Sequence, residues 1–179
     1  MPDLQKNKWK IFFGVTVIGS FLDWFTKYLA VAKLQMGVQV PVIGSVLQWQ
    51  LIFNTGGLFG FNPKAWIPGF PTNLFYYIMS TIAMIVIVIY YSKIDVKAKF
   101  SYWGISLIMP GAIGNIFDRI IRPGKGVVDF IRIDLNFPPF NPWPIWNLAD
   151  AYITIGVALI IIDLWFQEKE KKPVKEKDN

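Results

Sequence analysis

The chain has 179 residues, of which 54% are hydrophobic and 17% aromatic; this composition excludes an ordinary soluble domain and favours a membrane protein with several spans. The formal net charge is +6, but the basic residues gather in the tails and one short loop, where membrane topology explains them without a nucleic-acid partner. No cysteine or histidine is present, which excludes disulfides, thiol nucleophiles, Ser-His triads and the usual zinc sites.

Four apolar stretches are each long enough to cross a hydrocarbon core of about 30 Å at roughly 1.5 Å per residue. They cover residues 9–29, 72–91, 100–121 and 148–166. The first is too long for a signal-peptide core and contains Asp23 and Lys27 near its end, so we interpret it as a retained helix. We therefore predict a mainly α-helical membrane protein with a single membrane-embedded domain, residues 1–167, followed by a charged, solvated and disordered cytoplasmic tail, residues 168–179.

The basic residues are divided unequally between the two sides of the membrane. Three lysines lie before or at the start of the first span, three separate the second from the third and five follow the fourth, which makes eleven on one side. The two other connections hold five basic residues, with Lys27 and Arg119 near the membrane edge. By the positive-inside rule both termini are cytoplasmic, and residues 30–71 and 122–146 face outward.

Both outward-facing segments contain predicted strands. VQVPVIGS at residues 38–45 and VLQWQLIF at 46–53 alternate polar and apolar residues, with Gly44 and Ser45 as the turn between them. GVVDFIRID at residues 126–134 indicates a third strand, and the four prolines of FPPFNPWP at 137–144 exclude both helix and central strand there. We expect a small extracytoplasmic β-sheet that rests on the membrane.

Strand alternation separates the two aspartates of GVVDFIRID. Asp129 falls on the same face as Val127 and Ile131, whereas Asp134 shares the other face with Arg132. We interpret Asp134 as half of a solvated ion pair. Asp129 is expected to have a raised pKa, because an apolar environment disfavours the charged carboxylate.

Polar side chains inside the predicted spans are candidates for the functional site, because leaving an ionisable group unpaired in hydrocarbon is costly. Asp23 and Lys27 are spaced i, i+4 and can neutralise each other, either as a structural ion pair or as a support of the site. In the third span Asn115 shares a face with Asp118 and Arg119. We expect Asp118 and Arg119 to satisfy one another or neighbouring backbone as a scaffold, and Asn115 to donate a hydrogen bond to the site.

Asp129 and Asp150 are the strongest candidates for catalysis. Asp150 lies about one turn inside the fourth span, with Asn147 and Thr154 on the same face as hydrogen-bonding neighbours. Neither aspartate has an assigned cation, as is required of two carboxylates that share one proton. The ionised member of such a pair can activate water while the protonated member polarises a carbonyl group.

Considered alone, these residues favour an intramembrane aspartic hydrolase. A proton-coupled transporter or a non-enzymatic membrane scaffold is the alternative. A transporter is expected to place its acids near the bilayer midplane on broken helices, whereas here the two acids lie at the outer membrane surface. A serine–lysine pair is disfavoured, because Ser20 and Lys27 are about 10 Å apart along their helix.

Five motifs resemble those of the bacterial lipoprotein signal peptidases, also called signal peptidase II. They are DWFTK at residues 23–27, NTGGLFG at 54–60, GAIGNIFDR at 111–119, GVVDFI at 126–131 and WNLADAYI at 146–153. They follow the family's order on a four-span frame and cover nearly the whole chain. The resemblance implies an aspartic endopeptidase that removes the signal peptide of prolipoproteins, N-terminal to a cysteine that already carries a diacylglyceryl group.

The resemblance also implies roles for particular positions. Asp129 and Asp150 match the family's catalytic pair, and the outward sheet and the loop after it match a cradle and a mobile flap over the substrate. NTGGLF departs from the usual NxGAAF, and Trp146 replaces a usual phenylalanine. These departures concern the flap and the fit of the signal peptide and leave the carboxylates unchanged. The positions that support the site or the substrate are Asp23, Lys27, Asn54, Gly56, Asn115, Arg119, Asn147 and Ala149.

The setting that the resemblance implies is the outer face of a bacterial cytoplasmic (inner) membrane. We expect a multi-pass monomer that acts on a lipid-modified prolipoprotein, contacts membrane lipids and binds no nucleic acid. We also expect it to use neither a metal nor a cofactor.

Overall fold

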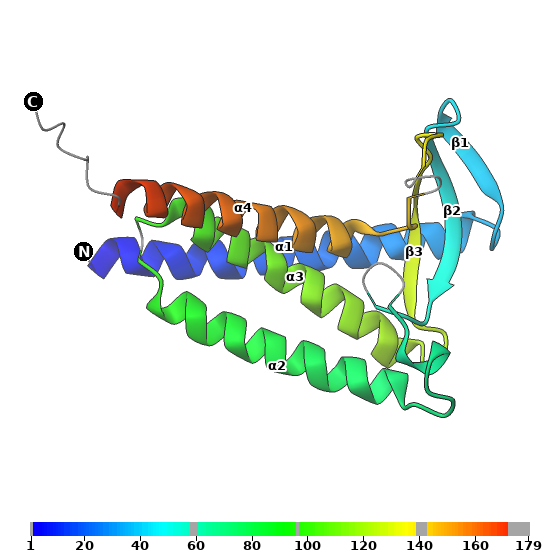
Figure 1. Cartoon of the computed structure of the whole chain (residues 1–179), viewed down its shortest axis with the longest axis horizontal. Coiled ribbons are helices and arrows are strands. Elements are labelled where there is room, and N and C mark those ends of the chain that lie inside the picture. Colours follow the sequence, from blue (N-terminus) through cyan, green and yellow to red (C-terminus); the bar gives the residue numbers. More distant parts are fainter. Residues whose placement is uncertain (1, 58–60, 96, 139–142, 172–179) are drawn as a thin grey trace, which may run out of the picture.

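Four long helices carry a small sheet at one end (Figure 1). The computed structural model describes residues 2–57, 61–95, 97–138 and 143–171. Each of the four helices is long and apolar enough to cross a membrane, which confirms the predicted frame. The helices are α1 (Pro2–Lys33), α2 (Thr72–Lys93), α3 (Lys99–Ile121) and α4 (Leu148–Lys171), and a short 3-10 helix, η2 (Pro63–Ala65), precedes α2.

Two helices extend beyond their predicted spans. α1 begins at Pro2 and ends at Lys33, and α4 continues to Lys171, whereas the apolar stretches covered only residues 9–29 and 148–166. The prediction of a disordered tail was therefore wrong for residues 168–171, because glutamate and lysine are good helix formers and continue the helix beyond its apolar part. The remainder of the predicted tail, residues 172–179, lies outside the described residues.

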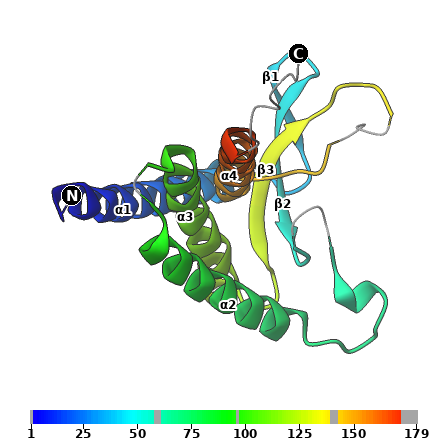
Figure 2. The ribbon, with the colours of Figure 1, turned by 60° about the vertical axis from the view of Figure 1, so that its left-hand side comes forward.

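α3 is the central helix of the bundle. Half of its most apolar stretch is buried inside the bundle. The corresponding share is 22% in α1, 17% in α4 and 6% in α2. α3 and α4 approach so closely that a Cβ on Gly104 would lie 2.5 Å from the carbonyl oxygen of Gly156, and the reverse also holds. α2 lies on the outer side of α3, away from α4 (Figures 1 and 2).

Lys8 fixes α1 to the end of α2, at the opposite end of the bundle from the sheet. Its ammonium group donates hydrogen bonds to the carbonyl oxygens of Tyr91 and Ile94, each at 2.9 Å, and the Tyr91 hydroxyl donates back to the Lys8 carbonyl at 2.7 Å. These contacts satisfy carbonyl groups that a helix end leaves without partners. The start of α1 and the end of α4 both lie at this end (Figure 1).

The sheet is antiparallel, with strand order β1-β2-β3. Its strands are β1 (Gln39–Ile43), β2 (Leu47–Asn54) and β3 (Val127–Ile133), which confirms the three predicted strands and the turn between the first two.

Apolar side chains attach the sheet to the bundle. Leu51, Val128 and Phe130 pack against Ala30 near the end of α1, and all four are buried. Gly126 precedes β3 with a φ of +87°, and a Cβ there would lie 2.6 Å from the backbone carbon of Asn54. β2 and β3 pair from this point, with Asn54 opposite Val127 and Ile52 opposite Asp129.

Candidate active site

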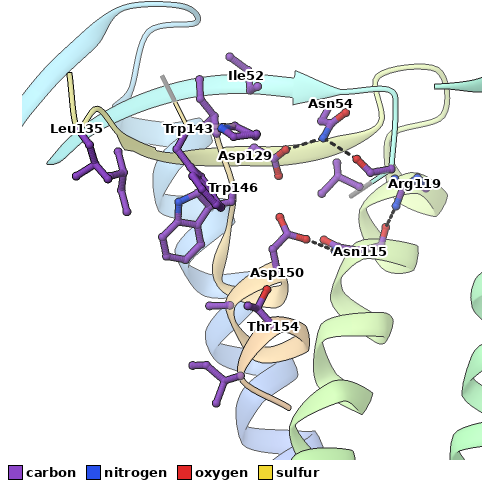
Figure 3. A pocket seen from close by; sticks show the side chains of 17 residues that line it. Ile52, Asn54, Asn115, Arg119, Asp129, Leu135, Trp143, Trp146, Asp150 and Thr154 are labelled. Carbon is purple, nitrogen blue, oxygen red and sulfur yellow. Dashed lines mark hydrogen bonds between the residues drawn. The ribbon is translucent and has the colours of Figure 1, made fainter. Parts of the chain in front are cut away.

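Asp129 and Asp150 approach one cavity from different elements. Asp129 belongs to β3 and Asp150 to the first turn of α4, and Figure 3 shows the two carboxyl groups facing one another. The cavity has a volume of about 750 Å³ and is lined mostly by apolar side chains from β2, β3, the segment before α4 and α4 itself. The structure thus brings together the two aspartates that the sequence singled out.

Asp129 is held by two asparagine amides. Asn54 Nδ2 donates to Asp129 Oδ2 at 2.9 Å, and Asn147 Nδ2 donates to Asp129 Oδ1 at 2.6 Å. The side chain is 1% exposed. Burial and the nearby Asp150 carboxylate raise the pKa of Asp129 to about 7, against the opposing effects of the two amides and of Lys27. At neutral pH this carboxyl group is therefore close to its titration midpoint.

Asp150 is held in the first turn of α4 by a reciprocal cap. The Asp150 backbone N–H donates to Asn147 Oδ1 at 3.0 Å, and the Asn147 backbone N–H donates to Asp150 Oδ2 at 3.3 Å, which is the geometry of a capping box. Asn115 Nδ2 from α3 donates to the other oxygen, Oδ1, at 2.8 Å. The prediction of Thr154 as a hydrogen-bonding neighbour was wrong: Thr154 lines the cavity, while the recorded bonds of Asp150 go to Asn115 and Asn147.

Three asparagines present N–H groups to the two carboxylates because their oxygens have other donors. Asn54 Oδ1 accepts the Gly56 backbone N–H at 2.8 Å. Asn115 Oδ1 accepts from Lys27 Nζ at 3.1 Å, and Asn147 Oδ1 accepts the N–H of Asp150. An amide whose oxygen faces a donor must turn its nitrogen to the opposite side, so all three orientations are fixed.

Lys27 is a buried cation that acts on the site through Asn115. Its ammonium group is 2.8 Å from Asp23 and 3.2 Å from Asp118, and it donates to Asn115. The predicted ion pair with Asp23 is confirmed, and the same lysine also binds Asn115, which contacts Asp150. Among the ion pairs of the described residues, none includes Asp129 or Asp150.

Asp23 links α1 to the start of α4. Its Oδ1 accepts the Ala149 backbone N–H at 2.9 Å. Gly114 of α3 faces Asp23 and the Ala149 side chain, and a Cβ on Gly111 would lie 2.5 Å from the Ala149 carbonyl oxygen. The small residues of the third span therefore let α4 lie close enough for Asp150 to reach Asn115.

Arg119 and Asp118 do not pair with one another, which corrects one of the two arrangements expected from the sequence. The Arg119 guanidinium donates to the Gly56 carbonyl oxygen at 2.6 Å and to the Asn115 carbonyl oxygen at 3.0 Å, so its partners are backbone groups. Asp118 instead pairs with Lys27 and Arg122. Adjacent residues in a helix point in different directions, which explains the divergence.

The segment before α4 closes one side of the cavity. Trp146 exchanges backbone hydrogen bonds with Ile131, at 2.8 and 3.0 Å, and Trp143 lines the cavity beside it (Figure 3). Asp134 pairs with Arg132 at 3.2 Å on the other face of β3, as predicted. Part of the predicted flap, residues 58–60, and part of the proline-rich segment, residues 139–142, lie outside the described residues.

Two tyrosines of α2 also contact the site, and the sequence interpretation did not include them. The Tyr76 ring lies against the Arg119 guanidinium, 4.6 Å from Cζ to the ring centroid, and the Tyr77 hydroxyl donates to the Arg119 carbonyl oxygen at 2.6 Å. Aromatic residues near the end of a span are usual interface anchors, so the sequence carried no signal that would separate these two from the others.

Asp129 is buried and Asp150 is half-buried, and amide N–H groups hold both carboxyl groups. Such a pair is suited to share one proton and to transfer it during hydrolysis. No cluster of three or more Asp, Glu, His or Cys side chains that could hold a metal ion occurs within the described part of the chain.

Comparison with known proteins points to one family over nearly the whole chain. A family model for signal peptidase (SPase) II matches residues 15–166. The lipoprotein signal peptidase of Anoxybacillus flavithermus is 31% identical over 171 residues, covering 94% of each chain, and that of Shouchella clausii is 33% identical, covering 88% of this chain and 95% of the relative. A bacterial membrane enzyme solved at 2.3 Å superposes with a TM-score of 0.76 at 31% identity, over 93% of this chain and 94% of that one.

Proposed function

Because the chain belongs to the signal peptidase II family, we propose that it is an aspartic endopeptidase whose catalytic pair is Asp129 and Asp150. The protein is a multi-pass membrane peptidase that removes signal peptides from prolipoproteins. The proposed cleavage site is the bond N-terminal to a cysteine that carries a diacylglyceryl group. The observation that carries the aspartic mechanism is the pair of facing carboxylates, Asp129 buried and Asp150 half-buried, each bound by asparagine N–H groups.

In the proposed reaction the pair holds one proton, as the pKa of Asp129 near 7 favours at neutral pH. The ionised carboxylate takes a proton from a water molecule, and the resulting hydroxide attacks the scissile carbonyl carbon. The protonated carboxyl donates a hydrogen bond to the carbonyl oxygen and stabilises the negative charge that develops there. The tetrahedral intermediate collapses when a proton passes from the pair to the leaving nitrogen, which frees the amino group of the lipidated cysteine.

The surrounding residues are proposed to keep this pair in place. Lys27 binds Asn115, and Arg119 binds the backbone at Gly56. Neither cation therefore pairs directly with a catalytic carboxylate, and neither lowers its basicity by such a pairing. Asp23 fixes the start of α4 through Ala149. A direct Lys or Arg partner would instead favour the doubly ionised pair, which cannot supply the proton that polarises the carbonyl.

The proposed orientation puts both termini in the cytoplasm and the sheet and cavity at the outer face of the membrane. The excess of lysine at the end opposite the sheet supports this orientation. The apolar lining of the cavity suits a substrate that carries acyl chains and an apolar signal peptide. We propose that the protein works as a monomer among membrane lipids.

The test is cleavage of a diacylglyceryl-modified prolipoprotein by the purified protein, followed by mass spectrometry of the product. We expect a mature fragment that begins with the lipidated cysteine. The matched control substrate has Ser in place of that cysteine and carries no lipid. Cleavage of both substrates at equal rates, or no cleavage of the lipidated one, would contradict the proposed specificity, and inhibition by a chelator would contradict a metal-free mechanism.

A further inference from the structure

We propose that Tyr76 is a positioning residue of this site, which holds Arg119 and the turn at Gly56 and Gly57 and through them the Asn54 amide that binds Asp129. The inference rests on the proposed function and adds to it a residue of α2, the helix that is least buried in the bundle. Its basis is a chain of contacts that runs from the lipid-exposed helix to the catalytic carboxylate.

Tyr76 makes two contacts that hold different parts of the site. Its ring lies on the Arg119 guanidinium, with 4.6 Å from Cζ to the ring centroid. Its hydroxyl donates a hydrogen bond to the Phe61 carbonyl oxygen, and the Gly57 backbone N–H donates to the same oxygen at 2.6 Å. One carbonyl group thus joins α2 to the turn that follows Asn54. A cation on an aromatic face in a buried setting is stabilised more than one in water.

Gly57 is the residue that leaves room for the phenol. A Cβ at this position would lie 2.8 Å from both Cε1 and the hydroxyl oxygen of Tyr76, and 3.0 Å from its Cζ. These separations are too short for a carbon, so a side chain at position 57 would push the ring away. The ring is held on Arg119 and by the Phe61 carbonyl, so it could move only by losing those contacts.

Arg119 transmits the position of Tyr76 to the catalytic pair. Its Nη2 donates to the Gly56 carbonyl oxygen at 2.6 Å, and the Gly56 N–H donates to Asn54 Oδ1 at 2.8 Å. Asn54 Nδ2 then donates to Asp129 at 2.9 Å. If the guanidinium moves, the turn at Gly56 loses its anchor and the Asn54 amide is free to rotate away from Asp129. Tyr76 therefore acts on the geometry of the reacting group and not on substrate binding.

The test is a double-mutant cycle of Tyr76→Leu and Gly57→Ala, with kcat and KM measured separately on the lipidated substrate. Tyr90→Leu is the matched control, because Tyr90 is an exposed tyrosine of the same helix. We expect Tyr76→Leu to lower kcat about tenfold with KM within about twofold, and Tyr76→Phe, which keeps the ring, to lower it about threefold. Tyr90→Leu should leave both constants unchanged.

The cycle separates this inference from a simple loss of packing. Gly57→Ala should lower kcat about tenfold in the wild-type background but by less than about twofold in Tyr76→Leu, because the smaller side chain no longer meets the added methyl group. Melting temperatures of the variants in detergent should stay near the wild-type value, which shows that a change in kcat does not come from unfolding. Equal effects of Gly57→Ala in both backgrounds, or a Tyr76→Leu effect confined to KM, would overturn the inference. Lack of cleavage by the wild-type protein would instead overturn the proposed function.

Discussion

Replacement of Asn54 by leucine should move the alkaline limb of the pH–rate profile to higher pH. Asn54 donates a hydrogen bond of 2.9 Å to the Asp129 carboxylate, and such a bond favours the ionised form and lowers the pKa. In the wild type the pKa of Asp129 is about 7, so kcat should fall above pH 7 as the shared proton is lost. Leucine has nearly the same volume but no donor, and the pKa of Asp129 should rise further.

The size of the shift follows from the strength of the bond. A hydrogen bond to a charged group contributes about 1.5–3 kcal/mol, and one pKa unit corresponds to about 1.4 kcal/mol, so the limb should move up by about one to two units. The assay is kcat from pH 5 to 10 on a fluorogenic lipopeptide. Gln50→Leu is the matched control on the same strand, because the Gln50 amide binds Gly37 and Arg132 and does not reach the pair. An alkaline limb that stays in place, or that moves to lower pH in Asn54→Leu, would refute this account of the Asp129 environment.

Two further predictions concern stability. Lys27→Met leaves two buried aspartates without their shared cation and should lower the free energy of unfolding by about 3–5 kcal/mol, seen as a lower melting temperature in detergent. Gly156→Ala places a methyl group 2.5 Å from the carbonyl oxygen of Gly104 and should cost about 1–3 kcal/mol, whereas Gly14→Ala meets nothing within 4 Å and should not destabilise α1. Equal melting temperatures of the two alanine variants would be evidence against the close contact of α3 and α4.

The four membrane spans and the faces of the strand that carries Asp129 could be predicted from the sequence. An apolar stretch in hydrocarbon must form a helix to satisfy its backbone, so the four spans were readable from hydropathy. The side-chain period of two in a strand predicted that Asp129 and Asp134 lie on opposite faces. In the structure Asp134 pairs with Arg132, and Asp129 lines the cavity. Both inferences depend on short-range pattern alone.

Contacts between residues far apart in the sequence could not be predicted in the same way. Arg119 was expected to bind Asp118 or neighbouring backbone. It binds the Asn115 carbonyl oxygen of its own helix and also the Gly56 carbonyl oxygen, which lies 63 residues away in the sequence. The contact of Tyr76 with Arg119 likewise depends on how α2 meets α3, which no periodic pattern records. Asn147 did carry a readable signal, because an asparagine three residues before an aspartate at the start of a helix is typical of a capping box.

The central claim is that Asp129 and Asp150 together perform the cleavage. The most direct measurement is the rate at which purified Asp129→Asn and Asp150→Asn variants process the lipidated prolipoprotein, with Asp134→Asn as the matched control from the other face of β3. Each of the first two should lose about 10³-fold or more of kcat while keeping the wild-type melting temperature, and the control should retain full activity. Undiminished cleavage by either Asp129→Asn or Asp150→Asn would contradict the claim.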